Sequence, residues 1–139
     1  MKGLVGQSYH LSCKSYPCPL IRSNSFAGGV QLEGDLKNKT PGQFFINMKY
    51  FNTMNKTDIE CLTLHETYPG HHYQISLVNE SNKIPLFMKI LNVESYVEGW
   101  GLYCETLGDY QDGYSLMGRY DYEIMRAARL AIDTGIHYY

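Results

Sequence analysis

The chain has 139 residues, in which 12 Lys and Arg side chains nearly balance 14 Asp and Glu side chains, giving a formal net charge of −2. That balance argues against a protein that binds nucleic acid by bulk phosphate neutralisation, and no stretch approaches the roughly 18–20 apolar residues of a membrane span. Hydrophobic residues make up 44% of the chain and charged residues 19%, so one packed domain is expected. From the N-terminus, residues 1–6 turn polar before a signal-peptide apolar region forms, which predicts a cytoplasmic location.

Residues 1–40 are predicted to be irregular, because Gly, Ser, Asn and Pro recur throughout them. Two short strands are nevertheless candidates: residues 43–49 are rich in aromatic side chains, and residues 30–33 alternate apolar and polar. The cysteines are expected to be reduced and structural, since nothing else indicates a secreted disulfide scaffold. A disulfide clip between Cys13 and Cys18 is the alternative.

The rest of the chain is predicted to be helical. Residues 57–60, Thr-Asp-Ile-Glu, form a capping-box signature that opens a helix through Glu66, and Pro69 then interrupts that helix. Further helices are expected at residues 71–78, 85–92, 94–107 and 115–134. The predicted fold class is therefore mainly α with a small β element, as a single domain over residues 1–139 whose motifs lie in residues 41–139.

The densest functional signal is a group of three histidines around a Pro-Gly pair. His65 is followed at once by Glu66, but the fourth position after His65 is Pro69, so the familiar His-Glu-x-x-His zinc motif fails on strict reading. On an unbroken helix His72 would lie about 10 Å along the axis from His65, too far to share one zinc ion. The break must therefore bend the chain to bring His71 or His72 back. The alternative is a capped helix end with surface histidines.

A second signal is the recurrence of glutamates in the segment after residue 93. Glu94, Glu98 and Glu105 are spaced four and seven residues apart, which puts them on one helix face. A carboxylate from a separate helix is the usual third ligand of a two-histidine zinc site, and it leaves a position open for water. A solvated acidic stripe is the alternative.

A third signal lies near the C-terminal end. On a helix, Arg126, Arg129, Asp133 and His137 fall within about 80° of arc, in a segment otherwise rich in Ala, Leu and Ile. Such a stripe on a largely buried helix needs internal pairing, so Asp133 is predicted to meet an arginine. An arginine and a histidine beside a metal could also stabilise an oxyanion. A structural salt-bridge network is the alternative.

Taken in order, these segments resemble the DUF885 family, which belongs with the metallopeptidase-like proteins of the zincin type. The segments that carry the resemblance are residues 41–47, 65–72, 98–105 and 126–137, and the likeness covers about residues 27–139. The resemblance implies a zincin-like, in outline gluzincin-like, helical catalytic region that binds Zn²⁺. Its implied ligands are the imidazoles of His65 and His71 and the carboxylate of Glu98, with Glu66 as the general base.

The resemblance also implies roles for residues around this centre. In the leading hypothesis Arg129 or His137 would stabilise the oxyanion, and the residues expected as supports or alternative ligands are His72, Glu105, Arg126 and Asp133. An extended peptide would pair with the strand at residues 43–47. The residues expected to contact substrate are Phe45, Asn47 and Tyr103.

Three functions remain open from the sequence. The leading one is a zinc-dependent peptidase acting on a peptide or a small amide, with no nucleic-acid or membrane partner. Because family members run to several hundred residues and this chain matches their C-terminal catalytic portion, a catalytically silent metal-binding or scaffold fragment is the alternative. A partner chain or self-association would then cover the exposed face. The third is a metal-assisted hydrolase of a non-peptide amide or ester.

Overall fold

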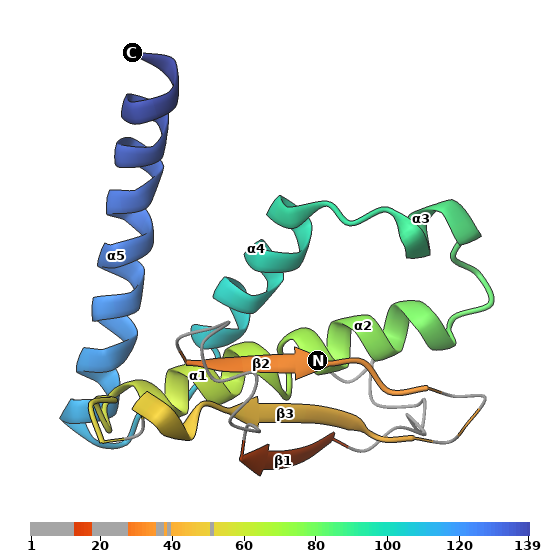
Figure 1. Ribbon diagram of the computed structural model, residues 1–139, viewed down its shortest axis with the longest axis horizontal. Helices are drawn as coiled ribbons and strands as arrows, with labels where there is room; N and C mark the ends of the chain where they lie inside the picture. The colour runs from red at the N-terminus through yellow and green to blue at the C-terminus, as the bar shows by residue number, and fades with distance from the viewer. Residues whose placement is uncertain (1–12, 18–27, 36–37, 39, 51) are drawn as a thin grey trace.

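The computed structural model describes residues 13–17, 28–35, 38, 40–50 and 52–139, and it shows a mainly helical protein with one small sheet (Figure 1). The elements in chain order are β1 (Cys13–Pro17), β2 (Gly29–Leu32), β3 (Gly42–Ile46), the 3-10 helix η2 (Met48–Tyr50), α1 (Asp58–Glu66), α2 (His71–Glu80), α3 (Leu86–Ile90), α4 (Glu94–Glu105) and α5 (Gly113–Tyr138). The predicted fold class, mainly α with a small β element, is confirmed.

The three strands form a single sheet in the order β1-β3-β2. β1 runs parallel to β3, with Cys13 opposite Gly42, and β2 runs antiparallel to β3, with Gly29 opposite Ile46. The strands predicted around residues 30–33 and 43–49 are therefore present. β1 was not predicted, so the irregular structure expected for residues 1–40 outside the candidate strand is wrong for Cys13–Pro17. β1 is an exposed edge strand that ends in Pro17. Because its side chains are not buried on one face, the sequence does not need to alternate apolar and polar residues there, and the strand has no recognisable pattern.

The helices begin and end close to the predicted positions, with two differences at their starts. Thr57 precedes α1, but its hydroxyl donates to Asp58 Oδ1 (2.9 Å) and makes no cap to a backbone N–H, so the predicted capping box does not form. α5 begins before the predicted residue 115, because Asp112 Oδ1 accepts the backbone N–H groups of Tyr114 (2.9 Å) and Ser115 (2.8 Å). The side chain of Asp112 thus sets where the long helix starts.

α1 lies at the centre of the molecule and packs against α4, α5 and β2. Two of the core side chains are the fully buried Cys61 and Cys104, and burial raises the pKa of their thiols to about 12 and about 11. Cys13, Cys61 and Cys104 all carry free thiols. The alternative of a clip from Cys13 involves Cys18, which lies outside the described residues.

α4 and α5 diverge from the end of the molecule where both approach α1, so α5 projects away from the sheet (Figure 1). Large apolar side chains stay exposed on α3 and along α5, including Phe87, Ile90, Leu130 and Ile136. α5 was predicted to be largely buried, but of its residues Gly118 is the buried one. Across the part of the chain that the structure describes, no helix has the length and apolar character needed to cross a bilayer.

Candidate metal centre

The short break between α1 and α2 brings two histidines together. α1 ends at Glu66 and α2 begins at His71, and the Tyr68–Pro69 peptide bond between them is cis. Gly70 packs directly on the carbonyl groups of Leu64 and His65, where any Cβ would overlap backbone atoms, so only glycine fits this tight return. The chain thereby doubles back, and the rings of His65 and His71 meet edge to face with their centroids 4.5 Å apart.

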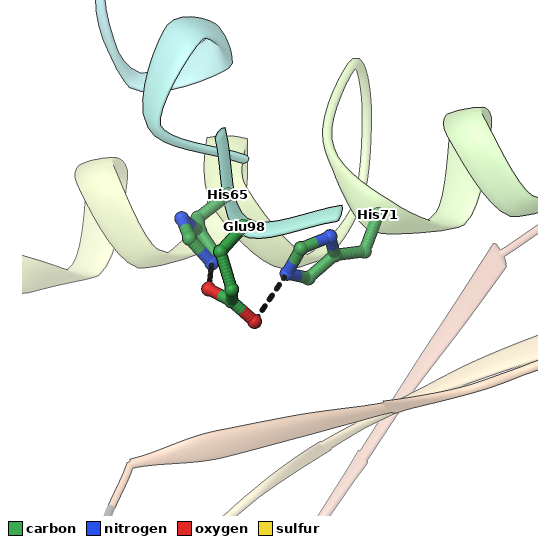
Figure 2. Close-up of side chains that lie close together, drawn as sticks. All are labelled: His65, His71 and Glu98. Atoms are coloured by element: carbon green, nitrogen blue, oxygen red, sulfur yellow. Dashed lines mark ion pairs between the residues drawn. The ribbon is translucent and has the colours of Figure 1, made fainter. Parts of the chain in front are cut away.

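A carboxylate from a third helix completes the cluster. Glu98, on α4, places Oε2 3.4 Å from His65 Nε2 and Oε1 3.7 Å from His71 Nε2. Figure 2 shows this carboxylate lying between the two imidazole rings, above the sheet. The possible ligand atoms of the three residues all lie within 4.8 Å of one another. The histidines are buried, whereas the Glu98 side chain is 58% exposed, so the cluster opens to solvent on the glutamate side.

The donor set and its spacing fit a zinc ion. Two imidazoles and one carboxylate are the protein ligands of several catalytic zinc sites, in which a fourth position takes water or substrate. Ligands held about 2.0–2.1 Å from a tetrahedral zinc lie about 3.4 Å from one another, close to the two nitrogen–oxygen distances found here. His65, His71 and Glu98, the candidate ligands that the family resemblance implied, are therefore brought together by three separate helices.

Glu105 and Arg126 hold His65 from behind. Glu105 Oε1 lies 2.7 Å from His65 Nδ1, and Arg126 binds both oxygens of the same carboxylate at 2.8 and 3.1 Å. Glu105 is 2% exposed, so its charge needs this bidentate partner. In the tautomer protonated at Nδ1, this N–H donates a hydrogen bond to the Glu105 carboxylate and leaves the Nε2 lone pair on the side of Glu98. A carboxylate behind a ligating histidine is the usual way to orient the ring and raise its basicity toward a metal.

The surroundings of His71 favour the neutral form of its imidazole, the form in which a histidine binds a metal. Burial lowers the pKa of its imidazole, and the neighbouring His65 lowers it further. Its Nδ1 atom is buried with no hydrogen-bond partner among the described residues. A neutral imidazole keeps a lone pair for a metal over a wider pH range than a protonated one.

Glu66 directly follows His65, and its carboxyl group has a shifted pKa. Burial raises the pKa of its carboxyl group, and the negative charge of Glu98 adds to that effect, while the positive forms of His65 and Arg126 oppose it. The backbone N–H of Gln31, on β2, donates to the Glu66 carboxylate. A carboxylate whose pKa is moved toward neutral pH can accept a proton and release it again.

His72, the neighbour of His71, faces the sheet instead of the cluster. Its Nδ1 atom lies 3.2 Å from Gln31 Nε2, and its ring covers Gly42 so closely that a Cβ at that position would overlap it. His72 is 3% exposed and lies outside the group of possible ligands. Its contacts fasten α2 to β2 and β3.

Of the other predicted residues on α5, Arg129 and Asp133 line a cleft that Glu98 also lines, whereas His137 does not line it. Arg129 lines a cleft of about 730 Å³ between α4 and α5, which also contacts Glu98 and Arg126. Asp133 was predicted to pair with an arginine, but its carboxylate lies 3.3 Å from His137 Nδ1. His137 is 11 residues beyond Arg126, about 16 Å along the helix axis, and its side chain is 72% exposed, so it does not reach the cluster. His137 therefore does not lie where the predicted stabilisation of an oxyanion would require it.

The predicted substrate contacts are also separated by the fold. Asn47 is fully buried directly after β3, and Phe45 packs against Tyr16 of β1 with ring centroids 5.8 Å apart. Tyr103 is half exposed on α4, next to Trp100. β3 is the central strand, paired on both sides, so the expectation that a peptide adds to its edge is wrong.

Two helical glycines of α4 allow a matched test of the centre. A Cβ on Gly101 would lie 2.5 Å from His65 Cε1, whereas a Cβ on Gly99 would meet nothing within 4 Å. Gly101→Ala is expected to displace the His65 ring, lowering zinc affinity by about 10–100-fold and metal-free stability by about 1–3 kcal/mol. Gly99→Ala is expected to keep the affinity, with a gain of up to about 1 kcal/mol from helix propensity. Zinc competition titrations and urea unfolding measure both, and wild-type affinity in Gly101→Ala would contradict this account of the packing.

Several functional positions escaped the sequence-based interpretation. The histidine rings contact residues that are 30 or more positions away in the sequence: His72 contacts Gln31 and Gly42, and His65 contacts Gly101. A single sequence carries no signal of such contacts. The Asp-Gly-Tyr-Ser run at residues 112–115 was readable as a helix cap and would have placed the start of α5 correctly.

Fold and site together define a class: a mainly helical protein that gathers two histidines and a glutamate from three helices around one point. The family described as bacterial protein of unknown function (DUF885) matches residues 10–139, and the chain belongs to this family. The crystal structure of a candidate lipoprotein from Colwellia psychrerythraea is similar, with 32% sequence identity and a TM-score of 0.85. The likeness covers 92% of this chain and 23% of that one, so the chain spans about a quarter of the solved relative. No curated protein matches the sequence significantly.

Proposed function

We propose that this chain carries the catalytic centre of a zinc-dependent hydrolase of the zincin type, which cleaves peptide bonds with an activated water. The observation that supports the proposal most directly is the His65–His71–Glu98 cluster, with nitrogen–oxygen distances of 3.4 and 3.7 Å. The carboxylate behind His65 and the carboxylate of Glu66 beside it add the two further parts that such a centre uses.

Four residues would have separate roles in this reaction. His65 and His71 would hold zinc through their Nε2 atoms and Glu98 through its carboxylate. When bound, zinc would polarise the substrate carbonyl and make a water molecule more acidic. Glu66 would accept the proton of the attacking water and pass it to the leaving amine, while the Gln31 backbone N–H keeps its carboxylate in place.

The outer edge of β2 is the place where an extended substrate would bind. Asn47 N–H donates to the Gly28 carbonyl (2.9 Å), and in an antiparallel pair such bonded positions alternate. Gly29 and Gln31 therefore direct their backbone groups away from β3, and the Gln31 N–H accordingly meets Glu66. A peptide pairing with the backbone groups of Gly29 and the carbonyl of Gln31 would lie beside α1 and α2, next to the cluster, and would leave the Gln31 N–H to Glu66 (Figure 1).

A catalytically silent scaffold is the second candidate. It is favoured by the large apolar side chains that remain exposed on α3 and α5, such as Leu86 (70%) and Leu130 (75%), because surfaces of this kind are usually covered by a partner. Such a scaffold would bind metal without turnover.

Metal analysis and activity assays on one preparation test both candidates. We expect about one zinc per chain and hydrolysis of peptides that a chelator abolishes and zinc restores. Parallel assays on peptide, aminoacyl-amide and ester substrates would identify the bond that is cleaved. Stoichiometric zinc with no hydrolysis of any of the three would support the scaffold, and a chain that binds no zinc would refute both.

A further inference from the structure

We propose that Trp100 is a positioning residue for the metal centre: its indole N–H holds the Pro69 carbonyl and thereby fixes His71 against Glu98. Trp100 Nε1 lies 2.9 Å from Pro69 O, which gives a direct bond between α4 and the break that separates α1 from α2. This inference rests on the proposed metal binding by the cluster and concerns how its geometry is kept.

The Pro69 carbonyl needs a donor from outside its own helix. In a continuing helix the N–H of Tyr73 would bond to it, but Tyr73 N–H is directed to Thr67 O (3.4 Å), and the first regular bond of α2 runs from Gln74 N–H to Gly70 O (3.1 Å). A carbonyl left without a donor in a half-buried turn is costly, so the indole N–H has a specific partner to satisfy.

The bond closes a short loop that contains two of the three ligands. His71 lies two residues after Pro69, and Glu98 lies two residues before Trp100. The hydrogen bond from Trp100 to Pro69 therefore closes one end of the loop, and the 3.7 Å contact between His71 and Glu98 closes the other. Glu98 itself is mostly exposed, and Gly99 beside it has open space around it. Of the α4 residues in this loop, Trp100 is therefore the one whose side chain is held by packing.

Aromatic packing keeps the indole in the plane that this bond requires. The Tyr73 ring stacks on Trp100 at 6.4 Å and 24°, and Tyr68 meets Tyr73 edge to face at 4.8 Å. Tyr103, one turn further along α4, leans against the other part of the indole at 5.7 Å. Tyr73 of α2 and Tyr103 of α4 thus pack on the indole, while Tyr68 of the break packs on Tyr73, and these contacts reduce the freedom of the indole to leave the Pro69 carbonyl.

The experiment removes the N–H donor and keeps the ring. Trp100 is the single tryptophan of the chain, so growth on a benzothienyl analogue, with sulfur in place of the indole N–H, changes this position alone. We expect the zinc dissociation constant to rise about 3–10-fold, the change that corresponds to the net contribution of one neutral hydrogen bond. The visible spectrum of the cobalt-loaded protein should change with it, because the ligand geometry is altered. Trp100→Phe, which also lacks the donor, should shift both readouts in the same direction.

Tyr103→Phe is the matched control, since it keeps an aromatic ring in the same cluster and removes a hydroxyl instead of the indole N–H. Its zinc affinity is expected within about twofold of wild type, and thermal unfolding of the metal-free proteins separates loss of fold from loss of affinity. Wild-type zinc affinity and an unchanged cobalt spectrum in the analogue protein would overturn the clamp while leaving the metal centre intact. A wild-type chain that binds no zinc would remove both.

Discussion

His71→Asn is expected to lower zinc affinity by more than about 100-fold, whereas His72→Asn leaves it within a few-fold of wild type. The loss exceeds the 10–100-fold typical of a residue behind the ligands, because Nε2 of His71 is itself one of the three candidate ligand atoms. Asparagine reproduces the Nδ1 position of histidine but not Nε2, so each variant removes the same atom from adjacent residues. Competition with a chromophoric chelator measures both affinities.

The paired design separates a metal ligand from a structural histidine. His72→Asn keeps a polar atom near Gln31 Nε2, which lies 3.2 Å from His72 Nδ1 in the wild type, so the contact that fastens α2 to the sheet is retained. A similar loss of zinc in the two variants would mean that His72 also binds the metal, contrary to the geometry. Far-UV circular dichroism of both metal-free proteins would verify that neither has unfolded.

Glu66→Gln is expected to reduce kcat for peptide hydrolysis by roughly 10²–10⁴-fold while zinc affinity changes by less than about threefold. Glutamine has the same shape and can still accept the Gln31 N–H through its amide oxygen, but it cannot take a proton from water. Because Glu66 is not one of the three ligands, the metal should stay in place. Steady-state kinetics on the zinc-loaded proteins give kcat and KM separately.

Glu60→Gln provides the charge-matched control, since it lies on the same helix outside the cluster and removes the same negative charge. Its kcat should match that of the wild type. Undiminished turnover in Glu66→Gln would exclude this carboxylate as the base, and a parallel loss of zinc would instead point to a ligand role.

The local pattern predicted most of the fold because helices and central strands leave periodic signals. The four longer helices were placed to within a few residues, and Pro69 marked the break correctly, since proline cannot continue a helix. β1 could not be predicted, because an exposed edge strand is defined by its partner and not by its own side chains. The strand order β1-β3-β2 could not be predicted either. It makes β3 the central strand, so the free edge next to α1 belongs to β2 and not, as had been expected, to β3.

The metal cluster was predictable for a related reason. His65, His71 and Glu98 carry the residue types that bind zinc, and their sequence spacing left a choice between His71 and His72. That choice depends on the path of four residues through the break, where Gly70 rests on the carbonyl groups of α1. The stripe of charged residues from Arg126 to His137 led to a wrong placement of His137. A stripe on one helix face shows which side chains are neighbours, but not how far the helix extends from the site.

The contact between Arg126 and Glu105 makes the centre sensitive to the tilt of a whole helix. Gly118 packs on the backbone of Thr57 and anchors the first part of α5, and Arg126 lies eight residues, about 12 Å, further along. A rotation of about 10° around that anchor would move the guanidinium roughly 2 Å, enough to break the 2.8 Å bond to the carboxylate that orients His65. A tilt of α5 would thus be passed to His65 through the contact between Arg126 and Glu105.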